Sequence, residues 1–124
     1  RALLNFGHTI GHAIEKAKNF SLTHGECISL GMVAAAFISW KRDKISMETY
    51  YEVRDMFVPF YLPISIDDID AQEILKLTKS DKKAEAGTIK FILLNRIGQA
   101  VIDKTVTDEE ILEALKEIIF VEED

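Results

Sequence analysis

Three histidines, whose side chains are well suited to metal binding, lie within the first 24 positions of the chain. His8 and His12 are four residues apart, so on a helix they project from the same face. His24 follows Thr23 in a sequence that is typical of a helix start. Imidazole is the commonest side-chain metal ligand, and several imidazoles can share one ion. The pattern predicts a metal site, and it leaves open whether His8 pairs with His12 or one of them pairs with His24.

Further polar residues share the histidine face of the first predicted helix, residues 1–17. A helix advances about 100° per residue, which places Arg1, Asn5 and Glu15 on the same stripe. Guanidinium and amide groups suit the recognition of carboxylates and phosphates, so an anionic small-molecule substrate is expected. Glu15, or Glu26 at the start of the next helix, could complete the set of metal ligands.

A pair of glycines lies on the flank between this polar face and the opposite, apolar face. Gly7 and Gly11 are four residues apart, and a glycine inside a helix costs about 1 kcal/mol relative to alanine. The pair therefore predicts that a partner helix or a ligand approaches the backbone closely.

The remaining elements are predicted from helix caps and from hydrophobic periodicity. Capping boxes begin helices at Thr23 and Thr107, and Ser46 and Asp70 provide further cap-like starts. The helix after Thr23 is apolar nearly all round, which predicts a buried central helix. Residues 88–102 have the alternation and turn typical of a β-hairpin. The fold class is therefore mainly α, a single helical domain with one short β-hairpin.

Several apolar residues are assigned packing roles. Phe20 is expected to anchor the loop after the first helix, and Cys27 is expected to pack rather than to act as a nucleophile. Four further aromatic residues are assigned to the core: Tyr50, Tyr51, Phe57 and Phe60.

Composition limits the class of protein. The chain has 124 residues, 48% of them apolar, and a formal net charge of −6, which favours a folded domain and disfavours nucleic acid as a partner. Its one cysteine excludes an internal disulfide and fits a reducing compartment, so a cytoplasmic location is expected. The longest apolar run, residues 28–40, is too short to span a membrane. Because the predicted site begins at Arg1, the chain is interpreted as a fragment.

A specific motif combines these residues at fixed spacing. Its members are Arg1, Asn5, Gly7, His8, Thr9, Gly11, His12, Ala13 and Glu15, followed by His24, Gly25, Glu26, Gly31 and Met32. Weaker matches continue through Asp81-Lys82-Lys83, Gly87 and Ile97-Gly98. The motif resembles the carboxy-terminal domain of 3-dehydroquinate synthase, within the wider sugar phosphate cyclases.

The resemblance implies a lyase of the shikimate pathway of aromatic amino-acid biosynthesis. Such an enzyme converts a heptulosonate 7-phosphate into 3-dehydroquinate and phosphate with NAD and zinc or cobalt. Residues 1–124 would form its C-terminal metal- and substrate-binding domain, and the N-terminal NAD-binding domain would be absent from this chain. The full-length protein would be a homodimer, without a nucleic-acid or membrane partner, and the fragment alone would be inactive.

The resemblance also assigns roles to the histidines. His8 and His24 occupy the zinc-ligand positions, and a glutamate upstream of this chain would be the third ligand. His12 occupies a position that contacts the substrate and takes part in proton transfer. The resemblance thus favours the pairing of His8 with His24 across two helices.

The implied anion-binding residues distinguish such a synthase from a metal-dependent polyol dehydrogenase, for example glycerol dehydrogenase. Arg1 would hold the substrate carboxylate, Asn5 the substrate phosphate and hydroxyls, and either Lys82 or Lys83 the phosphate. A polyol dehydrogenase acts on a neutral substrate and has no need of this set. Two further hypotheses are another sugar phosphate cyclase, such as 2-deoxy-scyllo-inosose synthase, and a non-catalytic helical interaction module.

Overall fold

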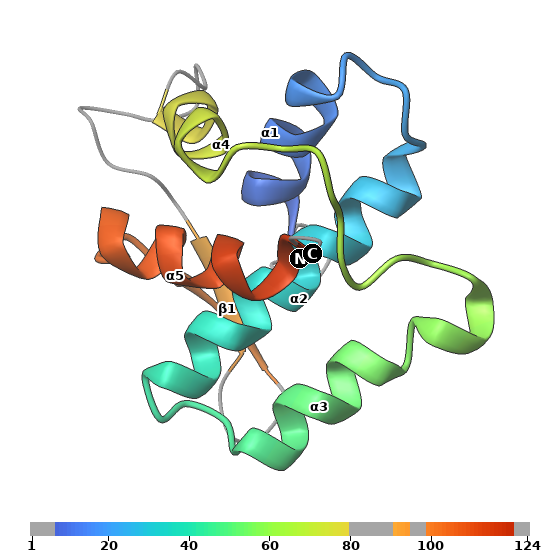
Figure 1. Ribbon diagram of the computed structural model, residues 1–124. Helices are drawn as coiled ribbons and strands as arrows, with labels where there is room; N and C mark the ends of the chain where they lie inside the picture. The colour runs from blue at the N-terminus through green and yellow to red at the C-terminus, as the bar shows by residue number, and fades with distance from the viewer. Residues whose placement is uncertain (1–6, 80–90, 95–98, 121–124) are drawn as a thin grey trace.

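The computed structural model describes residues 7–79, 91–94 and 99–120. Within these ranges the chain is mainly helical, with one small antiparallel sheet, as the sequence predicts (Figure 1). The elements in chain order are α1 (His8–Ala17), α2 (His24–Lys41), α3 (Met47–Asp55), η2 (Val58–Phe60), α4 (Ala71–Lys79), β1 (Phe91–Leu94), β2 (Ala100–Asp103) and α5 (Asp108–Ile118).

Helix α2 is the central element of the core. It packs against α1, α3, α5 and β1, while α4 packs against α1 and α5 (Figure 1). A helix with neighbours on several sides must be apolar on several sides, and residues such as Leu30, Val33 and Ile38 are almost completely buried. The prediction of a buried central helix is confirmed.

The helix starts follow the predicted caps. The hydroxyls of Thr23 and Thr107 each accept a hydrogen bond from the backbone N–H of the glutamate three residues later. Each of these glutamate side chains accepts a hydrogen bond from the backbone N–H of its threonine. Ser46 caps α3 by a bond from the backbone N–H of Thr49, at 3.1 Å. The Asp70 carboxylate accepts a bond from a backbone N–H in the first turn of α4, at 3.2 Å. These contacts are local, which is why the sequence predicts them well.

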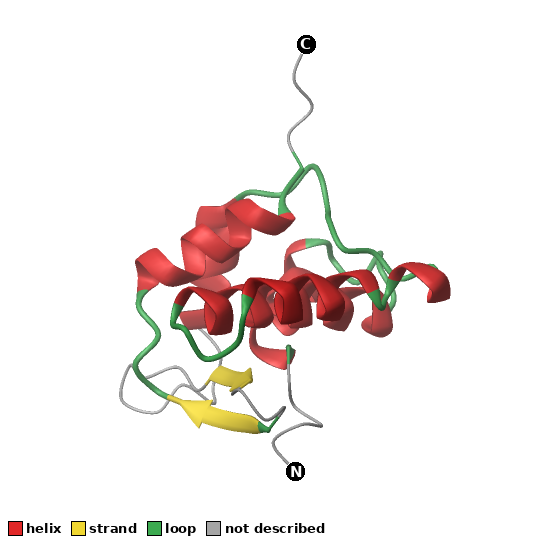
Figure 2. Cartoon of the chain, turned by 90° about the horizontal axis from the view of Figure 1, so that it is seen from below, coloured by secondary structure: helices red, strands yellow, loops and turns green. Residues whose placement is uncertain are grey.

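The predicted hairpin is also present. Strands β1 and β2 pair antiparallel, with Phe91 opposite Asp103 and Leu94 opposite Ala100. The sheet lies to one side of the helices (Figure 2), and the side chain of Leu93 in β1 is buried in the core. The predicted turn at residues 95–98 lies outside the described residues.

The first helix differs from its prediction. It begins at His8, because Gly7 has φ +84°, a left-handed conformation that cannot continue a right-handed helix. The prediction of one continuous helix over residues 1–17 is therefore wrong at its start. Helical spacing therefore no longer places Arg1 and Asn5 on one stripe with the histidines of α1. Both residues lie outside the described ranges.

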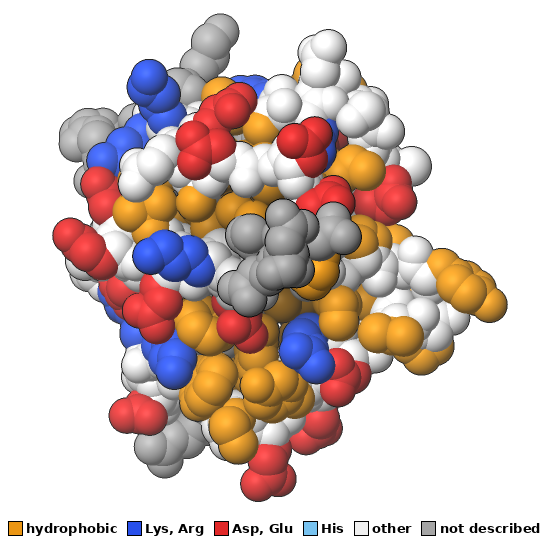
Figure 3. All heavy atoms as spheres, viewed as in Figure 1, with side chains coloured by type: hydrophobic (Ala, Val, Ile, Leu, Met, Phe, Trp, Pro, Cys, Tyr) orange, Lys and Arg blue, Asp and Glu red, His pale blue; other side chains and the backbone are white. Residues whose placement is uncertain are grey.

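The assignment of aromatic residues to the core is half correct. Of the four residues, Tyr50 and Phe57 are buried, whereas Tyr51 and Phe60 are exposed, with Phe60 at 74%. Phe20, the expected loop anchor, is exposed as well. Phe20 lies in a turn at φ 60°, and Phe60 lies in a 3-10 helix of a single turn, whose short backbone offers little surface for packing. Hydrophobic side chains accordingly gather on the protruding edge that follows α3 (Figure 3).

Among the described helices, none combines the length and apolar character that a membrane span requires.

Candidate functional site

The three histidines lie together where α1 packs against the start of α2. His8 and His12 are on successive turns of α1, and His24 is the first residue of α2. The ring centroids of His8 and His24 are 5.6 Å apart. The other two separations are longer, 6.1 Å between His8 and His12 and 6.3 Å between His12 and His24. The residues predicted from the sequence as metal-ligand candidates thus form one cluster.

Glycines allow the two helices to come this close. A Cβ atom at Gly7 would lie 2.6 Å from the backbone nitrogen of Met32, and one at Gly11 would lie 3.0 Å from the backbone oxygen of Cys27. A Cβ atom at Gly31 would collide with the carbonyl oxygen of Gly7. Since these neighbours are backbone atoms, a side chain would force the helices apart. The predicted close approach at the glycine pair is confirmed, and the approaching group is the partner helix.

The imidazoles suit a metal ion in chemistry and in spacing. Two imidazoles that bind one zinc ion tetrahedrally, with Zn–N distances of about 2.1 Å, have ring centroids roughly 5 Å apart. The separation of His8 and His24 is nearest to this value. The Nδ1 atom of His8 is buried, which leaves Nε2 as the nitrogen that could meet a metal ion. The residues present therefore fit a zinc or cobalt ion with two imidazole ligands.

The two candidate glutamates have other partners. The Glu26 carboxylate accepts a hydrogen bond from the backbone N–H of Thr23 at 2.8 Å, so it serves the helix cap. Glu15 Oε1 lies 2.9 Å from Nδ1 of His24. Among residues 7–79, 91–94 and 99–120 no group of three or more histidine, cysteine or acidic side chains is placed to hold a metal. Two imidazoles are thus what the described part of the chain offers.

The contact between Glu15 and His24 was not identified from the sequence. The stripe did place Glu15 beside the histidines, three residues after His12. Its partner could not be named because that partner lies on another helix, and the angle between two helices is not encoded in local spacing.

Cys27 packs beside the cluster without joining it. Its side chain is fully buried, and burial, together with the negative charges of Glu15 and Glu26, raises the pKa of its thiol to about 11. The thiolate is the reactive form of cysteine, so a thiol with a raised pKa is a poor nucleophile at physiological pH. The expectation that Cys27 is a packing residue is confirmed.

The four predicted anion-binding residues cannot be placed. Arg1 and Asn5 precede Gly7, the first described residue, and Lys82 and Lys83 belong to the range 80–90, which is also outside the described residues. Their proximity to the histidines therefore stays a prediction from the sequence.

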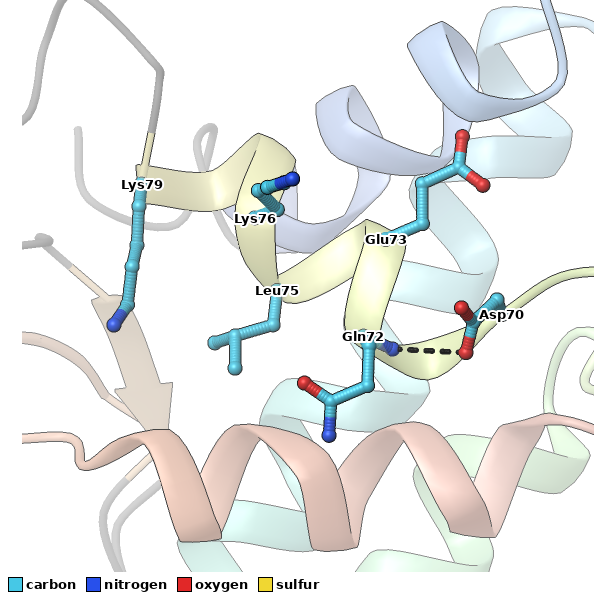
Figure 4. A pocket seen from close by; sticks show the side chains of 6 residues that line it. All are labelled: Asp70, Gln72, Glu73, Leu75, Lys76 and Lys79. Atoms are coloured by element: carbon cyan, nitrogen blue, oxygen red, sulfur yellow. Dashed lines mark hydrogen bonds between the residues drawn. The ribbon is translucent and has the colours of Figure 1, made fainter.

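A separate depression of about 490 Å³ runs along α4. The side chains of Gln72 and Leu75 point from α4 toward α5, and the backbone N–H of Gln72 bonds to Asp70 (Figure 4). None of its lining residues was predicted as a site residue, and their charges are mixed. They are Asp70, Gln72, Glu73, Leu75, Lys76 and Lys79.

Solved structures with the same fold are sugar phosphate cyclases. One is 2-epi-5-epi-valiolone synthase from Streptomyces hygroscopicus subsp. jinggangensis 5008, with NAD+ and Zn2+ bound. It is 25% identical with a TM-score of 0.82, over 94% of this chain and 32% of that one. A 2-deoxy-scyllo-inosose synthase complexed with carbaglucose-6-phosphate, NAD+ and Co2+ is 26% identical with a TM-score of 0.70. That match covers 91% of this chain and 32% of the other.

Sequence comparison identifies the family more narrowly. The family model of the 3-dehydroquinate synthase C-terminal domain matches residues 1–84, and the chain belongs to this family. The 3-dehydroquinate synthase of Ruminiclostridium cellulolyticum is 39% identical over 112 residues, which are 90% of this chain and 31% of that protein. The chain thus spans about a third of the length of the curated relatives that it matches.

Proposed function

We propose that the protein containing this chain is a 3-dehydroquinate synthase. It would convert a heptulosonate 7-phosphate into 3-dehydroquinate and phosphate in the shikimate pathway. The observation that carries this proposal is the 5.6 Å separation of His8 and His24 at the contact of α1 and α2, within the residues that match the family model. Two imidazoles on two packed helices are what a metal site shared with the rest of the protein would need from this chain.

In this proposal the three histidines take two roles. His8 and His24 would hold the metal ion, and the part of the protein outside this chain would supply the remaining protein ligand. His12 is exposed, one turn along α1 from His8, so its imidazole can reach a bound substrate and exchange a proton with it.

The substrate's anionic ends would be held by residues 1–6 and 80–90. Arg1 bonds the carboxylate, Asn5 contacts the phosphate and hydroxyls, and one of Lys82 and Lys83 reaches the phosphate. When bound, NAD would accept a hydride from a substrate hydroxyl and zinc or cobalt would polarise the oxygen at that carbon. The chain's own residues would orient the substrate so that phosphate leaves after a proton is taken from the neighbouring carbon.

Another sugar phosphate cyclase is the second candidate. The TM-score of 0.82 with a valiolone synthase favours it, because helical domains this similar can serve related sugar phosphates. The two candidates differ in substrate, so a direct comparison of substrates separates them.

The rest of the protein would complete the enzyme. Relatives of this chain are about three times its length, so an N-terminal domain that binds NAD is the proposed partner within the same polypeptide, and the intact protein would be a homodimer. Residues 1–124 alone would bind metal weakly, through two ligands, and would not turn over substrate.

Phosphate release by the intact protein tests the proposal. With NAD and zinc or cobalt, we expect release from a heptulosonate 7-phosphate at a rate far above that from a hexose 6-phosphate. His8→Ala and His24→Ala should each lower kcat/KM by at least about 100-fold, because removing a direct metal ligand costs more than the 10- to 100-fold typical of its supporting residues. Glu113→Ala, an exposed position on α5, serves as the control.

Two results would contradict the proposal. Release from the hexose phosphate alone would favour a different cyclase, and turnover by residues 1–124 at the rate of the intact protein would show that no further domain is required.

A further inference from the structure

Glu15, on α1, contacts the imidazole of His24, which belongs to the histidine cluster and lies on α2. Its Oε1 atom is 2.9 Å from Nδ1 of His24, and the contact joins the third turn of α1 to the first residue of α2. The Glu15 side chain is only 13% exposed, whereas that of His24 is 57% exposed. A shielded carboxylate thus contacts one edge of a ring that is more than half exposed.

The chemistry of this contact decides which nitrogen of His24 carries the proton. A carboxylate only accepts hydrogen bonds, and a neutral imidazole has one donor nitrogen and one acceptor nitrogen. Nδ1 must therefore be the donor to Glu15, which leaves the lone pair of Nε2 available to a metal ion. A carboxylate bonded in this way also fixes the orientation of the ring.

Two other polar side chains near His24, those of Glu26 and His12, do not replace Glu15 in this contact. Glu26 lies on the first turn of α2 but is engaged by the backbone of Thr23 at 2.8 Å. His12, on the preceding turn of α1, keeps its ring centroid 6.3 Å from that of His24. Among the described residues Glu15 is the carboxylate that contacts His24.

We propose that Glu15 is a positioning residue that holds His24 in the tautomer and orientation required for metal binding. The inference rests on the proposed function, because it takes His24 to be a metal ligand. It goes further by assigning to Glu15 a role in metal affinity without direct contact with the ion.

The test measures zinc affinity of the intact protein by competition with a chromophoric chelator. Glu15→Ala should weaken zinc binding by about 10- to 100-fold, the usual effect of losing such a supporting residue. Glu15→Gln should weaken it less, since an amide oxygen still accepts the Nδ1 proton but carries no charge. Glu113→Ala, which removes an exposed carboxylate of α5, should bind zinc as the unaltered protein does.

A spectroscopic readout separates positioning from a general loss of structure. With cobalt in place of zinc, the visible absorption bands should shift in Glu15→Ala, while far-UV circular dichroism and the urea midpoint without metal stay close to those of the unaltered protein. An unchanged zinc affinity and cobalt spectrum in a folded Glu15→Ala protein would overturn the inference.

The outcomes also distinguish this inference from the proposed function. Weakened zinc binding in Glu15→Ala, in a protein that releases no phosphate from a heptulosonate phosphate, would support the positioning role and contradict the function. Normal zinc binding in Glu15→Ala, in a protein that retains phosphate release, would contradict the positioning role alone. Unchanged zinc affinity in His24→Ala would also overturn the inference, because it would show that His24 is not a metal ligand.

Discussion

Arg42, directly after α2, connects three elements through its guanidinium group. It donates hydrogen bonds to both carboxylate oxygens of Glu110, at 2.6 and 2.8 Å, to Asp103 at 3.0 Å, and to the side chain and carbonyl of Thr105. A basic residue just after a helix interacts favourably with the carbonyl end of the helix dipole, but the sequence does not show which side chains this guanidinium bonds. These partners cannot be read from local sequence because they are far away along the chain: Arg42 and Glu110 are 68 positions apart.

This network predicts an acid-labile contribution to stability. The hydrogen bonds from Arg42 lower the pKa of Glu110 from 4.5 to about 2, against the opposing effect of burial. A carboxylate with a lowered folded-state pKa stabilises the fold above its unfolded pKa, and this stabilisation is lost as pH falls from about 4.5 to about 2. Urea denaturation at several pH values should show this loss for the unaltered chain.

An arginine variant provides the comparison. In Arg42→Met the free energy of unfolding at pH 7 should fall by about 1 to 3 kcal/mol, and its dependence on pH below 4.5 should become shallower. Lys104→Met, at an exposed position of the neighbouring loop, should retain both values. Equal acid sensitivity of the Arg42→Met chain and the unaltered chain would rule out this explanation.

At the scale of elements, the contact of α1 with α2 depends on Gly31. A methyl group there would meet backbone atoms of Gly7 and Gly11, the latter at 2.7 Å. Alanine favours a helix over glycine by about 1 kcal/mol, but overpacking costs about 1 to 3 kcal/mol. Because the neighbours are backbone atoms, we expect Gly31→Ala to lower the free energy of unfolding.

Gly31→Ala should also weaken zinc binding, since His8 and His24 lie on the two helices that it would separate. Gly25→Ala is the matched control, because Gly25 is in the same helix and a Cβ there meets nothing within 4 Å. Urea denaturation and chelator competition measure the two effects. A Gly31→Ala chain as stable as Gly25→Ala, with unaltered zinc affinity, would show that the close approach is not required.

Elements could be predicted where their cause is local. The caps at Thr23, Ser46 and Thr107 and the two strands of the hairpin are each specified by a few neighbouring residues, and all are present. The start of α1 was predicted too early because periodicity alone cannot show that Gly7 adopts a positive φ. Helical spacing brought His8 and His12 together, but the contact between Glu15 and His24 depends on how two helices pack.

At the scale of the whole molecule, Tyr50 connects two aromatic residues of α2 to α5. Its ring, on α3, stacks on Trp40 of α2 with centroids 5.3 Å apart and lies 5.7 Å from Phe37. Its hydroxyl donates a hydrogen bond to Glu117 of α5 at 2.7 Å. Since Tyr50 is completely buried, its hydroxyl can reach solvent only when these helices separate.

The ionisation of Tyr50 should therefore report unfolding of the whole domain. Burial, followed by the bond to Glu117, raises the pKa of Tyr50 well above its usual value of 10.0. The unfolded chain releases this proton above about pH 10 while the folded chain keeps it, so stability should fall as pH rises beyond that value.

Absorbance at 295 nm and far-UV circular dichroism should be followed together through this alkaline range. Part of the tyrosinate signal should appear only as the helices unfold, and Tyr50→Phe should lack that part and lose less stability above pH 10. Complete tyrosine ionisation in a chain with unchanged helical signal would contradict the prediction, because it would mean that the Tyr50 hydroxyl reaches solvent without separation of α2, α3 and α5.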